Sequence, residues 1–407
     1  MTTAVMTDKN RTKWVVLTLA GITNALVAAA PGMSMSVLFA EIAADLDLSL
    51  VQVGVVWGIG SLPAILSALL GGGIIDRFGP KRVLQVTAVL AGLAGALRGF
   101  SNNFAFLVFS VILMGLIGPL ITMSGLKLSR LWFPDHQLGA SGGILSMGMA
   151  LGFFLSSTLS ATVLSPWLGG WRNVFFFYGG VSILLVLPWF LMPAAPASTA
   201  EETKREIKRP SLVKSFVHIA SKPNSWFLGL ALFGLGGAIQ SFLGYLPLYL
   251  RSVGWQAAAA DNALAGFHLI SMVFTLPLAL LSDRTRRRKP IALLMMAMTT
   301  IGIGAVGFMN GEWVWAAVLF AGAVRDGFMA VFLAMVINAD GVEPEYAATA
   351  TGFTFLFINL GNILMPAAGN AIAENNPSLA FAFWAACGAA GMLSMLLVKE
   401  RRREKVA

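Results

Sequence analysis

Long apolar stretches separated by short polar segments run through the whole of this chain. A helix that spans a bilayer needs about 20 consecutive, predominantly apolar residues. Twelve stretches meet this requirement: 14–40, 49–74, 83–100, 104–127, 137–163, 171–194, 224–250, 261–282, 290–309, 313–338, 346–372 and 377–398. The pattern therefore predicts an all-α membrane protein with twelve transmembrane helices.

The basic residues of the chain are distributed unevenly between alternate polar segments. If the N-terminus is cytoplasmic, the cytoplasmic loops and tails hold 24 of the 28 Lys and Arg residues. The outer side holds Arg98, Arg172 and Arg251, and Arg325 lies within an apolar stretch. Because cytoplasmic loops carry an excess of Lys and Arg, we expect a multi-pass protein of the cell (inner) membrane with both termini in the cytoplasm.

The longest polar segment, about 195–223, predicts a cytoplasmic linker between an N-terminal six-helix bundle (1–194) and a C-terminal one (224–407) with a basic tail. The two bundles show weak internal similarity. Asp76-Arg77 and Asp283-Arg284 are 207 residues apart, and each pair follows the second apolar stretch of its half. Because the matching pairs occur at the same place and in the same order in each half, they indicate two parallel six-helix repeats. This is the organisation of a secondary transporter.

Composition agrees with a lipid environment and excludes several classes of function. The chain is 57% hydrophobic and 12% charged, with a mean hydropathy of +0.78, whereas soluble domains carry about 25% charged residues. The net charge of +9 does not predict nucleic-acid binding, because the basic residues lie in short loops between apolar segments. One Cys, three scattered His and the lack of a phosphate-binding loop motif predict no metal site, no cofactor and no enzymatic activity.

The polar segment between the second and third apolar stretches carries a recognisable motif. It consists of Gly72, Asp76, Arg77, Gly79, Lys81 and Arg82. This spacing resembles the loop signature of the major facilitator superfamily, except that Pro80 stands where the family usually has a basic residue. The resemblance covers essentially the whole chain. It implies a gating role for these six residues, and for the weaker echo at Asp283 and Arg284, in stabilising the outward-open state.

A second segment resembles one branch of that family. Arg130-Leu131-Trp132-Phe133-Pro134 followed by Ala140-Ser141-Gly142 looks like the junction of helices four and five in anion porters of the oxalate/formate, nitrate/nitrite and cyanate type. Gln137 replaces a basic residue common in those branches. The Gly-x-x-x-Gly-Pro pattern of many drug/proton antiporters does not occur in 137–163.

Ionisable groups inside a spanning segment are costly and are functional candidates by default. Arg325 and Asp326 lie near the middle of the tenth stretch. Neighbours in sequence point about 100° apart on a helix, so the two need not pair with each other. Arg325 is the candidate for binding an anionic substrate and Asp326 for carrying a proton, while a structural ion pair between helices is the alternative.

Further candidates lie on helices that line the central cavity in this family, namely the first, fourth, seventh and tenth. Lys127, on the fourth, either adds a second cation for an anionic substrate or reaches the cytoplasmic interface. Asn24, Gln240 and Tyr245 either contact substrate or form hydrogen bonds between helices. Arg98, near the outer end of the third stretch, is expected to be an interfacial anchor.

Together these features predict a secondary active transporter that moves a small, carboxylate-like anion by alternating access, through proton symport or exchange. The expected partners are this substrate, protons and membrane lipids, and the expected state is a monomer. Two alternatives stay open. One is a proton-driven exporter of drug-like or amphipathic compounds, and the other is a non-transporting membrane sensor on a transporter scaffold.

Overall fold

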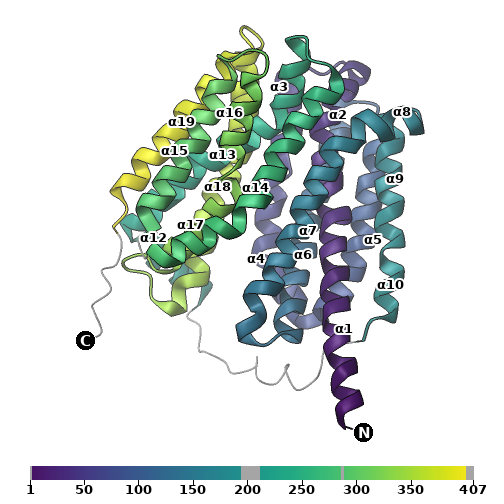
Figure 1. Cartoon of the computed structure of the whole chain (residues 1–407), viewed down its shortest axis with the longest axis vertical. Helices are drawn as coiled ribbons and strands as arrows, with labels where there is room; N and C mark the ends of the chain where they lie inside the picture. The colour runs from purple at the N-terminus through teal and green to yellow at the C-terminus, as the bar shows by residue number, and fades with distance from the viewer. Residues whose placement is uncertain (1, 194–210, 286–287, 400–407) are drawn as a thin grey trace. The chain divides into compact units, whose positions relative to one another are not determined.

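The computed structural model describes residues 2–193, 211–285 and 288–399, and every regular element within these residues is a helix (Figure 1). The predicted linker 195–223 therefore lies largely outside the described residues. The chain forms two compact units, which we call the first unit (Met1–Leu48 and Leu62–Glu206) and the second unit (Ser49–Ser61 and Ile207–Ala407).

The helices of the first unit follow the chain order. They are α1 (Thr2–Thr23), the π-helix η1 (Asn24–Ala29), α2 (Ala30–Leu46), α4 (Ser61–Phe78), α5 (Pro80–Gly99), α6 (Phe104–Trp132), the 3-10 turn η2 (Asp135–Gln137), α7 (Leu138–Leu159), the π-helix η3 (Ser160–Leu164), α8 (Ser165–Leu168), α9 (Trp171–Leu184) and α10 (Val186–Leu191).

The second unit contains one helix from the N-terminal half of the sequence. Its helices are α3 (Leu50–Ile59), α12 (Leu212–Ala220), α13 (Pro223–Ser252), α14 (Ala257–Thr285), α15 (Arg288–Val306), α16 (Trp313–Gly322), α17 (Arg325–Ile337), the 3-10 turn η4 (Pro344–Tyr346), α18 (Ala347–Ala373) and α19 (Leu379–Leu397). Within this unit α3 packs against α13 and α18.

Eleven helical segments of the described residues are long and apolar enough to cross a membrane. They correspond to eleven of the twelve predicted spans, and the remaining prediction, 83–100, coincides with α5. Five of the described spans are interrupted. The first passes through the π-helix η1 and the fifth through the π-helix η3, while the second breaks at Gly60, the sixth at Leu185, and the tenth at Ala323 and Val324. Pro and Gly residues within several spans predicted breaks of this kind, but the sequence pattern did not place the breaks at these residues.

Local sequence explains where several helices begin. Ser49 caps α3, because its side chain accepts from the amide of Gln52 while the Gln52 side chain accepts from the Ser49 amide. Gly79 joins α4 to α5 with φ of +82°, a conformation that favours glycine. Pro80 then occupies the first position of α5, where its missing N–H costs no intrahelical hydrogen bond.

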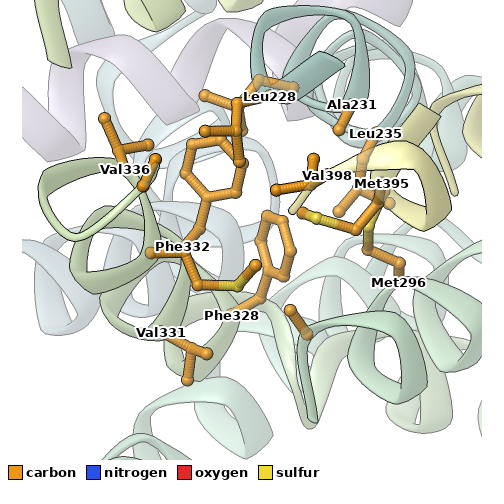
Figure 2. Packing of buried hydrophobic residues seen from close by; sticks show 14 of the residues in the cluster. Leu228, Ala231, Leu235, Met296, Phe328, Val331, Phe332, Val336, Met395 and Val398 are labelled. Atoms are coloured by element: carbon orange, nitrogen blue, oxygen red, sulfur yellow. The ribbon is translucent and has the colours of Figure 1, made fainter. Parts of the chain in front are cut away.

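A large apolar cluster of the second unit holds α17 in place. Phe328 and Phe332 of α17 are buried with Leu228 of α13, Met296 of α15 and Met395 of α19. Figure 2 shows the two phenylalanine rings among these aliphatic and thioether side chains. In a bilayer such side chains hold helices together mainly by close van der Waals packing. This packing fixes the start of α17, where Arg325 and Asp326 lie.

Candidate functional site

The break in the tenth span places two charged residues at the start of a half-helix. The helix α16 ends at Gly322, and α17 begins at Arg325. The first turn of a helix has backbone N–H groups without intrahelical partners and carries partial positive charge. An acidic residue is favourable there, and Asp326 is in this first turn. Discontinuous helices of this kind form substrate and ion sites in many transporters.

Arg325 and Asp326 form an ion pair with each other. The Arg325 guanidinium donates to the Asp326 carboxylate at 2.7 Å. The helical geometry alone does not require this contact, but at a helix start the long Arg side chain can fold back onto its neighbour. The ion pair therefore lies within one helix and not between helices. The side chains remain 25% and 29% exposed, so the pair is not sealed by packing.

The helix α14 supplies the polar groups next to this pair. The amide of Asp326 donates to Ser271 Oγ at 3.1 Å, which ties the start of α17 to α14. His268 lies one turn earlier on α14, is 1% exposed and interacts electrostatically with Arg325. A guanidinium, a carboxylate, a hydroxyl and an imidazole thus gather in the second unit. Of these groups, the guanidinium, the hydroxyl and the imidazole can donate hydrogen bonds to a carboxylate or a similar oxyanion.

The predicted cation Lys127 pairs with a residue of the loop motif. Lys127 Nζ lies 3.0 Å from Asp76 Oδ1, which joins α6 to the end of α4 within the first unit. The described partner of Asp76 is thus a basic side chain of its own unit. A substrate role for Lys127 stays a prediction. An anionic substrate would have to compete with the Asp76 carboxylate for the Lys127 ammonium group.

The other motif residues organise the junction between α4 and α5. Lys81 donates to the backbone carbonyl of Met192, at the C-terminal end of α10, and the Arg77 guanidinium lies 5.4 Å from the Phe78 ring centroid. Gly72 and Arg82 are exposed. The side chains of Asp283 and Arg284 lie outside the described residues, so their gating role stays a prediction.

Three neutral candidates are engaged in contacts between helices. Asn24 is 1% exposed in η1 and accepts from Thr122 Oγ1 of α6 at 3.2 Å. Gln240 contributes its backbone carbonyl, which accepts from Trp57 Nε1 at 2.6 Å. Tyr245 is buried beside Phe381 and Trp384 of α19, with ring centroids 5.7 Å apart in both cases. These contacts do not test whether any of the three also meets substrate.

Arg98 is buried and Arg251 is partly buried, although the sequence pattern placed both at the outer side and indicated no partner for either. Arg98 is 3% exposed, donates to the Pro31 carbonyl at 2.8 Å and lies 5.6 Å from the Phe175 ring centroid. The prediction of an interfacial anchor was therefore wrong, because Arg98 faces helix α2 and not the surface of the unit. Arg251 binds both carboxylate oxygens of the fully buried Asp261 at 2.7 Å. An acid ten residues after the Arg was the available signal, since buried carboxylates need such partners.

The fold and these sites define a multi-pass, all-α membrane protein with charged and polar groups at breaks in its spanning helices. The profile of the Major Facilitator Superfamily matches residues 17–366 and again 263–407, and the chain belongs to this family of membrane transporters. The predicted resemblance and fold class are thereby confirmed. The family membership also confirms that the protein is a transporter and not an enzyme.

Individual relatives share the family and differ in their named substrates. The chain is 27% identical over 380 residues to the uncharacterized MFS-type transporter YhjX of Escherichia coli, covering 88% of each sequence. It is 23% identical over 381 residues to the probable galactarate/D-glucarate transporter GudP of the same organism, covering 82% of this chain and 81% of the relative. A crystal structure of the nucleoside transporter NupG (D323A mutant) matches with a TM-score of 0.78 at 13% identity, over 94% of this chain and 99% of that one, which supports the fold alone.

Proposed function

We propose that this protein is a secondary active transporter of a small carboxylate-like anion, with Arg325 as the residue that binds the anion. The observation that carries the proposal is the partly exposed Arg325–Asp326 pair at the start of α17. A guanidinium can bind a carboxylate through two parallel hydrogen bonds, and the helix start adds a favourable electrostatic field. The name of the relative GudP, a probable transporter of two sugar diacids, supports the same substrate class.

The geometry supports a simple coupling scheme. An anionic substrate and the Asp326 carboxylate would compete for the same guanidinium, because Asp326 already occupies Arg325 at 2.7 Å. A carboxylate in a membrane that loses its cationic partner binds a proton more readily. Substrate binding at Arg325 would therefore favour proton uptake at Asp326, which is proton symport. Alternating access of the two six-helix bundles would then carry both to the other side.

The orientation of the protein belongs to the same proposal. The concentration of Lys and Arg in alternate loops supports a location in the cell membrane with both termini in the cytoplasm. The gating role of the loop motif is supported by the Lys127–Asp76 pair and by the contact of Lys81 with α10. Both contacts join the cytoplasmic ends of helices in this orientation.

Thermal stabilisation of the purified protein tests the substrate class directly. A ligand that binds the folded state raises stability by mass action, by about 2.7 kcal/mol at a hundred times its dissociation constant. We expect a small mono- or dicarboxylate from a panel of anions, apolar cations and neutral solutes to raise the melting temperature. Arg325→Gln should abolish the shift, and Arg130→Gln, which removes an exposed cation at the end of α6, should retain it.

Two results would contradict the roles proposed for Arg325 and Asp326. If apolar cations alone stabilise the protein and Arg325→Gln responds as the native chain does, Arg325 is structural and an exporter of amphipathic compounds becomes the better proposal. Uptake of the stabilising anion into proteoliposomes then tests coupling. Collapse of the proton gradient should slow uptake by the native protein, and an unchanged rate would remove the role assigned to Asp326.

A further inference from the structure

The short helix α12 is attached to the start of a spanning helix. It ends at Ala220, and α13 begins at Pro223. The indole N–H of Trp226, in the first turn of α13, donates to the Ala220 carbonyl at 2.7 Å, and Trp226 is 46% exposed. Tryptophan is enriched at the level of lipid head groups, where its ring meets both apolar and polar surroundings. The contact therefore fixes the end of α12 beside an exposed tryptophan at the start of α13.

One side of α12 is docked on the second unit in a fixed orientation. Ile219 is fully buried in the apolar cluster that also contains Phe328 and Phe332, and Ser215 is 4% exposed. The His218 ring stacks on Tyr346 with centroids 4.2 Å apart, and His218 Nε2 lies 3.1 Å from Glu343 Oε2. These contacts determine which side of α12 faces away from the protein.

The side that faces away is apolar. Val213, Phe216 and Val217 are 73%, 43% and 61% exposed. Their spacing of i, i+3 and i+4 puts them on one side of the helix, which we call the α12 apolar face. Lys214 lies beside this face and is exposed. The Phe216 ring lies at the edge of this face, with its centroid 5.5 Å from that of Phe353 of α18, so Val213 and Val217 are the side chains that would be most unfavourable in water.

We propose that α12 is an in-plane membrane anchor, whose apolar face inserts among the lipids of the cytoplasmic leaflet while Lys214 meets anionic head groups. Interfacial helices bind through this combination of apolar area and basic charge. The continuity with α13 and the position of Trp226 favour lipid as the occupant over another protein.

Spin labels in the full-length protein test this placement. Single cysteines are introduced in turn at Val213, Val217 and Lys214 in a Cys387→Ser background, which removes the one native thiol. After reconstitution in nanodiscs of phosphatidylcholine and phosphatidylglycerol, accessibility to oxygen and to a water-soluble nickel chelate is measured. We expect the labels at positions 213 and 217 to be reached by oxygen and protected from nickel. The label at position 214 should show the opposite pattern.

Two results would overturn the insertion. Nickel access at position 217 equal to that at position 214 would place the apolar face in water. Protection of position 217 from both reagents would show that protein covers it, such as the chain before α12 or a partner.

The role of anionic lipid has its own comparison. The variant Lys214→Gln is prepared with the label at position 217. In membranes that contain phosphatidylglycerol, it should lower the ratio of inserted to non-inserted label about fivefold, because one basic residue near an anionic surface contributes about 1 kcal/mol. The same substitution should have no effect in phosphatidylcholine alone. An equal response in both lipids would overturn the assignment of Lys214 to anionic head groups.

Discussion

Lys127 Nζ of α6 lies 3.0 Å from Asp76 Oδ1 at the end of α4, so one candidate substrate ligand and one residue of the loop motif share a single ion pair. The two side chains are 29% and 65% exposed. Exposed pairs of this kind contribute less than about 1 kcal/mol to stability. The consequence of breaking this pair should therefore be seen in transport and not in unfolding.

We expect Lys127→Gln and Asp76→Asn to slow transport by similar factors, with melting temperatures close to that of the native protein. The two variants should have similar KM values for the substrate, because both break the same gating contact. Uptake kinetics in proteoliposomes measure both quantities. A raised KM in Lys127→Gln alone would instead show that Lys127 binds substrate. The charge-swapped double variant, Lys127→Asp with Asp76→Lys, is the matched control and should recover part of the rate.

The buried pair of Arg251 and Asp261 should behave in the opposite way. Asp261 is fully buried and accepts two hydrogen bonds from the Arg251 guanidinium. Arg251→Met should lower the free energy of unfolding by about 3–5 kcal/mol, because it leaves a buried carboxylate without its cation. Denaturant titration in detergent measures the loss.

Two comparisons control for the size of the substituted side chain. Arg251→Met combined with Asp261→Leu should regain most of the lost stability, since no charge then stays buried. Arg172→Met removes a cation whose partner Asp45 is 42% exposed, and should cost less than about 1 kcal/mol. Equal losses of unfolding free energy in Arg251→Met and Arg172→Met would contradict the prediction that a buried ion pair contributes more to stability than an exposed one.

The contact between Glu343 and His218 of α12 predicts that the stability of the folded protein decreases at acidic pH. A hydrogen bond from its own backbone amide, and next the hydrogen bond with His218, hold the pKa of Glu343 below its ordinary value. A carboxylate with a lowered pKa in the folded protein stabilises the fold above its unfolded pKa, about 4.3. That stabilisation is lost as the pH falls through the folded value.

Glu343→Gln should therefore melt below the native protein at pH 6, and the difference should disappear on acidification below about pH 4. Other carboxylates titrate in this range, so the measured quantity is the difference between the two proteins at each pH. Glu345→Gln, a neighbouring exposed acid in the turn η4, is the control and should follow the native curve. A difference that grows with acidity would have the wrong sign and would exclude the contact as its source.

Close packing of α1 and α7 predicts the effect of a single added methyl group. A Cβ at Gly148 would lie 2.4 Å from the Gly21 carbonyl oxygen and 2.9 Å from the Gly21 Cα, both backbone atoms that cannot move aside. Gly148→Ala should lower the free energy of unfolding by about 1–3 kcal/mol, the usual range for overpacking. Gly143→Ala on the same helix meets no atom within 4 Å. It should be neutral or raise stability by up to about 1 kcal/mol, because alanine is the better helix former.

The spanning helices could be predicted from sequence because apolar length is a property of the chain itself. The stretch 104–127 became α6, and 224–250 became α13, with ends that differ by a few residues. The motif that contains Asp76 and Gly79 was also recognised from the sequence, while the positive φ of Gly79 is a finding of the structure. These features depend on residues close together in sequence.

The parts that could not be predicted depend on approaches between distant residues. Asp76 and Lys127 are 51 positions apart, and no pattern indicated that their side chains meet. Arg98 is buried where it contacts Pro31, 67 positions away, and the two helices on either side of the break at Ala323 and Val324 both pack on α14. Arg325 and Asp326 were identified from their charge alone, while their mutual contact needed the helix start that only the fold provides.

The Arg251–Asp261 pair also bears on how the protein reaches its folded state. It joins the end of α13 to the start of α14 across ten residues, and the entropy lost in closing so short a loop is small. Neither charge is tolerated alone in an apolar setting, so each helix end becomes stable only when the other is present. The two helices are therefore expected to form as one hairpin during synthesis, before the later helices of the chain are available to pack against them.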